Sequence, residues 1–283
     1  MSRKRKEPHP RIAVVLSDLH AGCQMALCPP EGFRLDSGSI HVPKGPQAAL
    51  WPVWVEFWEW VAQVTAGEPY DLVFNGDCLD GVHHGSTTQI SHNRNDQRRL
   101  AVHLLAPHVA RAARYFHVRG TEAHVGQSGE DEESVARELG AVPNEEGQHA
   151  RYDLWLRMGG PKGPLVHFLH HIGTTGSAAY EATAVHKELV ESYAEAGRWG
   201  DEPPRAIVRS HRHRALRISL PVDDGEALAV VTPAWQLKTP FAWKIPGARL
   251  SQPQIGGTIL IVGEEAGLYA RSFTRRMTRS KEV

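Results

Sequence analysis

The chain has 283 residues, of which 41% are hydrophobic, so it is long enough and apolar enough to bury a sizeable core. Its 32 Lys and Arg residues balance its 32 Asp and Glu residues. No apolar stretch approaches the length of a membrane span, and no apolar signal region follows the charged N-terminus. These features argue against a disordered chain and against a membrane partner, and we expect a soluble, cytoplasmic protein.

The charge is unevenly distributed along the chain. Residues 1–11 carry five Lys and Arg against one Glu, and residues 271–283 also carry five against one. The rest holds 22 basic and 30 acidic residues, so it is net acidic by eight. We expect solvated basic tails at residues 1–10 and 276–283, although such tails also suit nucleic acid, and a single domain over residues 11–275.

The cysteines and histidines indicate different chemistry. Three cysteines, an odd number, do not make a disulfide framework, which fits a reducing compartment. Cys23 and Cys28 lack the second pair that a thiolate metal site needs, so we expect free thiols. In contrast, the chain has 17 histidines, and histidine is the commonest metal ligand among side chains.

The first predicted strand ends in two polar side chains. The run Ile12–Leu16 is short, uninterrupted and rich in β-branched residues, which predicts a buried parallel strand. Residues just past such a strand lie at the ligand-binding crevice of an open α/β sheet. Asp18 and His20 are two residues apart, so an extended backbone would point both at a common point. This is a metal-ligand arrangement.

The next segment is predicted to be an insertion. Residues 21–46 are rich in Pro and Gly and predict a long surface loop. Residues 47–64 have helical apolar spacing and hold four of the eight tryptophans. We interpret most of this aromatic stripe as packing against the sheet and leave Trp51 and Trp60 as candidate surface contacts. Residues 21–65 thus form an inserted loop and a Trp-rich helix.

Two further strands end in glycine-led turns. Tyr70–Asn75 is the second predicted strand, and the following glycine lets the chain turn sharply so that Asp77 emerges at the same edge as Asp18. The third strand, residues 116–119, follows a helix predicted over residues 93–115 and ends in a turn. That turn contains Thr121, Glu122 and His124.

In the second half of the chain, two further predicted strands end in histidines. A helix over residues 128–139 precedes a hairpin, 150–158 with 164–169, which ends in His170 and His171. A helix over residues 178–196, closed by Gly197, leads to a strand at 206–209 that ends in His211 and His213. Short β segments are predicted at 215–220, 227–231, 256–262 and 268–273.

Five motifs follow these strands in a fixed order. They are D-x-H at Asp18 and His20, G-D-x-x-D at Asp77 and Asp80, a glycine-led turn with His124, the pair His170-His171, and H-x-H at His211 and His213. Each motif is weak alone, but together they resemble the calcineurin-like metallophosphoesterase family. The resemblance spans residues 18–213. It implies an α/β fold, a four-layer α/β/β/α sandwich of two mixed β-sheets flanked by helices, with a metal site at the strand carboxyl ends.

The resemblance also implies a centre of two divalent metal ions. Asp77 would bridge both ions, since a carboxylate has two oxygens where a histidine reaches one ion only. Asp18, His20 and His213 would complete one site, and His211 the other together with His170 or His171. We favour His170 because it is the first residue past the strand. Carboxylate and neutral imidazole ligands suit Mn, Fe, Zn or Ni.

One departure from the family concerns its third motif, usually G-N-H followed by an acid. Here Thr121, Glu122 and Ala123 separate the glycine from His124, so the ligating Asn is missing. His124 is the candidate for the catalytic histidine, while Thr121 and Glu122 are weaker candidate ligands. A longer turn with a loosely bound or absent second ion is the alternative. Asp80 is expected to hydrogen-bond within its loop or to support a ligating histidine.

The implied reaction is hydrolysis of a phosphodiester or phosphomonoester by metal-bound hydroxide. The motifs do not choose between nucleases, nucleotide phosphodiesterases and protein phosphatases. We favour a phosphodiesterase acting on nucleic acid or nucleotides, although the acidic body lacks the positive stripe of a dedicated duplex binder. A catalytically weak or inactive protein that serves as a binding or scaffold module is the alternative, because the Asn is missing.

Overall fold

The computed structural model describes residues 9–83, 85–126, 128–173, 177–245, 251–264 and 267–277. The two predicted tails lie almost wholly outside these residues, and the part of the C-terminal tail that is described begins inside a strand. None of the helices in the described ranges is both long and apolar enough to cross a membrane.

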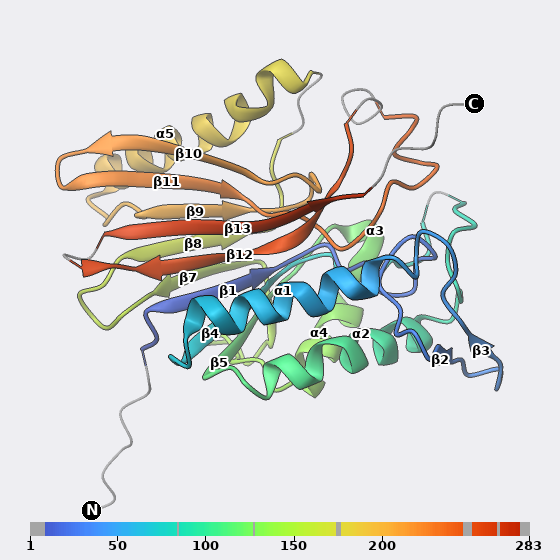
Figure 1. Cartoon of the computed structure of the whole chain (residues 1–283). Helices are drawn as coiled ribbons and strands as arrows, with labels where there is room; N and C mark the ends of the chain where they lie inside the picture. Colours follow the sequence, from blue (N-terminus) through green and yellow to red (C-terminus); the bar gives the residue numbers. More distant parts are fainter. Residues whose placement is uncertain are drawn as a thin grey trace, which may run out of the picture.

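Two mixed β-sheets form the centre of the molecule (Figure 1). The first has the order β13-β12-β1-β4-β5-β6, in which β1, β4, β5 and β6 are parallel. β12 pairs antiparallel with both β1 and β13. Its strands are β1 (Ile12–Leu16), β4 (Tyr70–Asn75), β5 (Arg114–Val118), β6 (Ala150–Arg151), β12 (Gln254–Val262) and β13 (Leu268–Arg276).

The second sheet has the order β10-β11-β9-β8-β7, with parallel pairing of β8, β9 and β11. At one edge β7 pairs antiparallel with β8, and at the other edge β10 pairs antiparallel with β11. Its strands are β7 (Asp153–Arg157), β8 (Leu165–Leu169), β9 (Ala206–Arg209), β10 (Leu216–Val222) and β11 (Gly225–Val231).

Helices cover the outer face of each sheet, which gives the predicted four-layer α/β/β/α sandwich (Figure 1). α1 (Leu50–Thr65), α2 (Arg94–Val109) and α4 (Glu130–Glu138) share one apolar cluster with the outer face of the first sheet. The 3-10 turn η1 (Ala178–Tyr180) leads into α5 (Glu181–Trp199), which packs on the second sheet. A third cluster fills the space between the sheets, because buried strands alternate side chains toward both faces.

The tryptophan-rich helix is a packing element. Trp54 and Trp58 are buried and their rings contact each other edge to face, with 5.5 Å between centroids. Trp51 and Trp60 also pack against this cluster and are half-buried, so part of each side chain stays accessible. The three cysteines are buried free thiols, as predicted.

Several predicted boundaries differ from the structure. The predicted strand 150–158 is two strands in different sheets, because the chain bends at Tyr152 as it crosses from β6 to β7. The helix predicted over 93–115 ends at Val109, since Arg114 begins β5 and forms a bidentate ion pair with Asp71. α5 continues through Gly197 and ends before Gly200, whose left-handed backbone closes the helix.

Two short elements were not predicted. The long loop contains the hairpin β2 (Phe33–Arg34) and β3 (Ile40–His41). The turn after β5 contains the single helical turn α3 (Glu122–Val125). The terminal β segments also form two long hairpins, β10–β11 and β12–β13, and are longer than predicted.

Candidate metal centre

The predicted ligands lie together where parallel strands of both sheets end. β1, β4 and β5 are in register, with Leu16 opposite Phe74 and Asn75 opposite Val118, so their carboxyl ends are level. β8 and β9 end level in the second sheet. The first sheet supplies Asp18, His20 and Asp77, and the second supplies His170, His211 and His213.

A buried asparagine links the two sheets beside this site. Asn75 Nδ2 donates hydrogen bonds to Leu169 O at 3.2 Å and to Ser210 Oγ at 2.7 Å. In return, Asn75 O accepts the Nδ1–H of His170 at 2.6 Å. This bond fixes the ring of His170 so that Nε2 points toward the site, a common way to orient a metal-binding histidine.

The first group of donor atoms is the Asp18 cluster, formed by Asp18, His20 and His213. His213 Nε2 lies 3.2 Å from His20 Nε2 and 3.3 Å from Asp18 Oδ1. Two nitrogens bound about 2.0–2.1 Å from one tetrahedral ion are separated by roughly 3.3 Å. The spacing of these three atoms therefore fits ligands of a common ion.

The second group is the His170 cluster, formed by Asp77, His170 and His211. Asp77 Oδ2 lies 3.1 Å from His170 Nε2 and 3.9 Å from His211 Nδ1. The same oxygen is 4.0 Å from His20 Nε2 in the Asp18 cluster. Asp77 Oδ1 instead accepts the backbone N–H of Thr121 at 2.6 Å. Thus one oxygen of Asp77 faces both clusters, whereas the sequence suggested that the two oxygens would each reach one ion.

The backbone at the site is strained. Asp18, His20, Asp77, His211 and His213 all have positive φ, between 44° and 70°. Ala66 is the only other non-glycine residue of the described ranges with positive φ. Such conformations cost about 1–3 kcal/mol each and concentrate at functional sites. The expectation of an extended backbone at Asp18 and His20 was wrong, and the left-handed turns aim both side chains inward instead.

The electrostatics of the site favour a cation. Asp18 Oδ1 and His170 Nε2 are buried without a hydrogen-bond partner. Burial opposes a charge on His170, but Asp77 and Asp18 outweigh it and raise its pKa to about 10. Burial also disfavours an ionised Asp18, yet His213 and His170 lower its pKa to about 2. A site that stabilises positive charge between two ionised carboxylates can hold a divalent metal ion, and the donors fit one.

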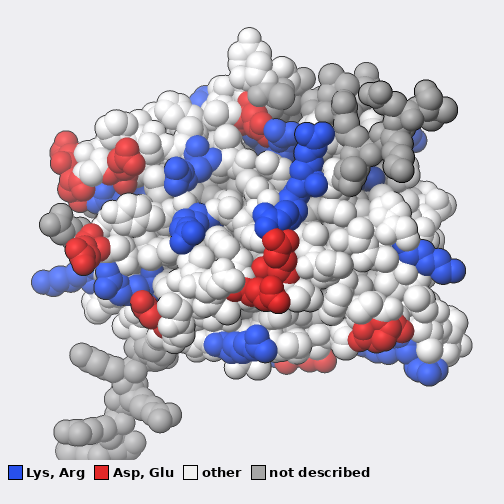
Figure 2. All heavy atoms as spheres, in the orientation of Figure 1, with Lys and Arg blue, Asp and Glu red and all other residues white. Residues whose placement is uncertain are grey.

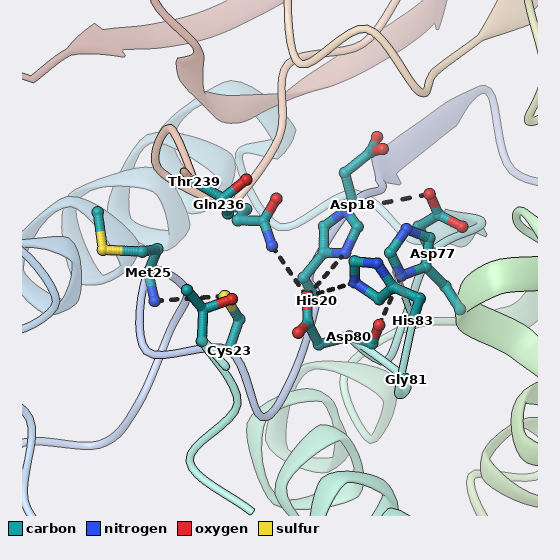
Figure 3. Close-up of polar contacts among 12 residues, drawn as sticks. Asp18, His20, Cys23, Met25, Asp77, Asp80, Gly81, His83, Gln236 and Thr239 are labelled. Atoms are coloured by element: carbon teal, nitrogen blue, oxygen red, sulfur yellow. Dashed lines mark hydrogen bonds and ion pairs between the residues drawn. The ribbon is translucent and has the colours of Figure 1, made fainter. Parts of the chain in front are cut away.

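Asp80 contacts the Asp18 cluster through His20 (Figure 3), and with His20 and His124 it forms a third group of donor atoms that could hold an ion. Its Oδ1 lies 3.6 Å from His20 Nδ1 and accepts Gln236 Nε2 at 3.1 Å, while Oδ2 accepts Gln89 Nε2 at 2.6 Å. Burial raises the pKa of Asp80, but the neighbouring imidazoles of His20 and His83 outweigh it and hold the pKa far below its usual value. Sequence reasoning missed Gln89 and Gln236, since neither follows a motif.

His124 lies beside the Asp18 cluster in α3. Its Nδ1–H donates to Asp80 O at 2.6 Å, and its ring stands edge-on to His20 with 4.5 Å between centroids. Burial lowers the pKa of His124 to about 4 despite the charge of Asp77, so the ring is neutral at pH 7. The displaced histidine therefore reaches the site even though its motif is irregular.

The weaker candidates differ in position. Thr121 Oγ1 lies 3.2 Å from both Asp77 Oδ2 and His211 Nδ1, at the edge of the His170 cluster. Glu122 and His171 are exposed and belong to no donor cluster among the described residues. His83 is half-buried, 3.9 Å from Asp80 Oδ1, and His84 lies outside the described residues.

A cavity of about 240 Å³ opens onto the Asp18 cluster. His20, Asp77 and His124 line its floor, and residues 237–245 contribute apolar side chains. Three basic residues also line it, namely Arg212, Arg214 and Lys238. The cavity thus combines metal-binding groups with cationic side chains that suit an anionic ligand.

Comparisons with known proteins find structural similarity at low sequence identity and no match in sequence. No family model and no curated protein matches the chain. Among solved structures, Vps29 of Chaetomium thermophilum is 10% identical, with a TM-score of 0.38, over 94% of this chain and 98% of its own. The sulfate thiohydrolase SoxB of Thermus thermophilus, in complex with glycerol, is 13% identical, with a TM-score of 0.41, over 94% of this chain and 57% of its own. At these TM-scores, only the chain's own residues carry an argument about function.

Proposed function

We propose that this protein is a divalent-metal-dependent phosphoesterase that hydrolyses phosphodiesters or phosphomonoesters. The observation that carries the proposal is the convergence of six carboxylate and imidazole side chains from four strand ends, five of them on strained backbone. A strained backbone persists only where the surrounding structure imposes it. Such strain does not improve the packing of the core, so its concentration at these strand ends indicates a functional site.

Asp77 Oδ2 belongs to the His170 cluster and lies 4.0 Å from His20 Nε2 of the Asp18 cluster, so two ions are proposed, one for each of these clusters, of Mn, Fe, Zn or Ni. When bound, the ions would neutralise the phosphoryl oxygens and lower the pKa of an attacking water. The chain's own residues orient the reactants. The basic side chains of Arg212 and Lys238 would attract the ester, whereas Arg214 is already paired with Glu181. His124 lies where it can contact the ester.

The substrate is proposed to be a nucleotide or single-stranded nucleic acid rather than a duplex. A cavity of about 240 Å³ holds a small group, not a double helix. On the face drawn in Figure 2, Lys and Arg are interspersed with Asp and Glu and form no continuous positive stripe. A protein phosphatase remains the competing assignment within the same chemistry.

Metal removal and restoration test the reaction. We expect the purified protein to contain divalent metal, to lose hydrolysis of an aryl phosphate or aryl phosphodiester after chelation, and to regain it with Mn²⁺. Equal hydrolysis before and after chelation would refute the metal mechanism. A panel of nucleotides, single- and double-stranded DNA, RNA and phosphopeptides then tests the substrate, and cleavage confined to phosphopeptides would refute the nucleotide assignment.

A non-catalytic binding protein is the second candidate, because a threonine hydroxyl stands where the family places an amide ligand. It predicts bound metal without turnover on either ester class. The same metal and activity measurements separate the two candidates.

A further inference from the structure

The helix α4 begins with four consecutive acidic residues, 130–133, which suggests a solvated face. The structure shows that three of them hold other parts of the chain instead. Asp131 pairs with Arg94 and Arg98 of α2. The other two, Glu132 and Glu133, each accept backbone N–H groups from other segments.

Glu132 is fully buried and joins the loops that follow β4 and β5. Its Oε1 accepts the N–H of Cys78 at 2.7 Å, and its Oε2 accepts the N–H of Gly120 at 2.7 Å. A buried carboxylate is costly unless its oxygens are hydrogen-bonded, so these two bonds are strong constraints on both loops.

The two amides flank residues of the candidate metal centre. Cys78 directly follows Asp77, and Gly120 directly precedes Thr121. The loops touch so closely that a Cβ added to Gly120 would lie 2.1 Å from Asp77 N and from Asp77 Oδ1. The N–H of Thr121 then donates to Asp77 Oδ1, which leaves Oδ2 facing both clusters.

We propose that Glu132 is a positioning residue that clamps these two loops from behind and thereby sets where Asp77 Oδ2 lies between the two clusters. The inference rests on the proposed function of this site. Glu132 does not contact the donor atoms of either cluster, and its effect passes through the backbone of Cys78 and Gly120. Loss of the clamp would release Asp77 from its strained conformation, with φ of 56°.

Glu133 provides a matched control on the same helix. It accepts the N–H of His149 at 2.9 Å and of Ala150 at 2.8 Å, so it also holds two backbone amides, but at the start of β6. Replacing either glutamate by Gln keeps its shape and turns one acceptor oxygen into an NH₂ group, which cannot accept a backbone N–H. Glu132 uses one oxygen for each loop and must lose one bond, whereas Oε2 of Glu133 accepts both of its amides and the remaining oxygen of Gln can keep both.

The test compares Glu132→Gln and Glu133→Gln in the full chain by calorimetric Mn²⁺ binding, ester hydrolysis and thermal unfolding. We expect the larger loss of Tm in Glu132→Gln, because Glu132 is fully buried whereas the side chain of Glu133 is 16% exposed. Mn²⁺ affinity should fall about 10- to 100-fold in Glu132→Gln, with kcat reduced more than KM changes, and stay within about twofold of the parent in Glu133→Gln. Equal Mn²⁺ affinities in the two variants would refute the positioning role of Glu132.

A metal-independent readout separates this inference from the proposed function. In the chelated protein, Glu132→Gln should accelerate hydrogen exchange at the amides of Cys78 and Gly120, and Glu133→Gln should not. Unchanged hydrogen exchange at these two amides would refute the positioning role of Glu132. A parent protein that binds no Mn²⁺ and hydrolyses no ester would refute only the proposed function. If Glu132→Gln does not fold, Glu132→Asp replaces it, since its shorter side chain keeps the charge and reaches one loop only.

Discussion

The two donor clusters of the candidate centre differ in how completely the protein surrounds them. In the Asp18 cluster, successive donors are 3.2 and 3.3 Å apart, and Asp80 supports His20 from behind. In the His170 cluster, the distances from Asp77 Oδ2 spread from 3.1 to 3.9 Å. The side chain of His211 is 34% exposed, against 21% for His213. We therefore expect the Asp18 cluster to bind its ion more tightly.

The difference follows from the elements that build each cluster. The loops after β1 and β4 continue to pair beyond the strands, since Asp18 N donates to Gly76 O at 2.8 Å and His20 N to Asp77 O at 3.0 Å. His170 is equally fixed, because its ring lies against Gly76, where an added Cβ would come within 2.4 Å of Nδ1. The backbone N–H groups of His211 and Thr121 donate to Asp18 Oδ2 and Asp77 Oδ1, but the side chain of His211 is 34% exposed, so we expect the His170 cluster to be weakest at this edge.

The largest effect is expected for Asp77→Asn, which breaks both clusters at their shared oxygen. The variant keeps the shape of the side chain but removes a negative charge that would offset the two proposed ions. Bound metal should fall well below that of the parent, and ester hydrolysis should be lost. Elemental analysis after dialysis measures the metal content. Two ions retained per chain would contradict the shared role of Asp77.

Replacing one histidine of each cluster in turn separates the metal affinities of the two clusters. His213→Asn deletes a donor of the Asp18 cluster, and His170→Asn deletes one of the His170 cluster. Each variant should keep about one ion per chain, and the ion that His170→Asn keeps should bind more tightly than the ion that His213→Asn keeps. Calorimetric titration with Mn²⁺ gives both affinities. Loss of both ions in each variant would show that the clusters are not separable.

A smaller effect is expected for Asp80→Asn, which tests the support behind His20. We expect about 10- to 100-fold weaker binding at the Asp18 cluster and unchanged binding at the His170 cluster. Asp96→Asn is the control, since Asp96 is also a buried carboxylate, but it bonds to Asp36 N and Ser91 Oγ away from the centre. Complete loss of metal in Asp80→Asn would instead make Asp80 a ligand.

The sequence predicted the layers and the side chains that converge at the strand ends, because both depend on local signals. Uninterrupted apolar strands followed by Gly, Asp and His identify strand ends, and parallel strands bring those ends to one edge. The sequence did not predict the left-handed backbone at Asp18, or that Asp77 Oδ1 accepts Thr121 N–H and leaves Oδ2 facing the clusters, since both arise from contacts between loops.

The supporting residues were missed for the same reason. Glu132, Gln89 and Gln236 are distant in sequence from the groups that they bind, by 54, 9 and 156 residues. Likewise, the split of 150–158 between two sheets depends on where the chain bends, at Tyr152, and period-two alternation carries no signal for that.

The smallest effect concerns Thr121, at the exposed edge of the His170 cluster. Its hydroxyl lies 3.2 Å from His211 Nδ1, where an amide oxygen would be a better ligand than a neutral hydroxyl. Thr121→Asn should therefore tighten Mn²⁺ binding at the His170 cluster a few-fold, and Thr121→Val, which removes the hydroxyl at nearly constant volume, should weaken it by a similar factor. The change at the Asp18 cluster should be smaller, because Thr121 reaches that cluster only through Asp77 and contacts none of Asp18, His20 or His213. Calorimetry on the parent and both variants measures the two affinities, and equal binding by all three proteins would show that the weakness of this cluster comes from the exposure of His211 alone.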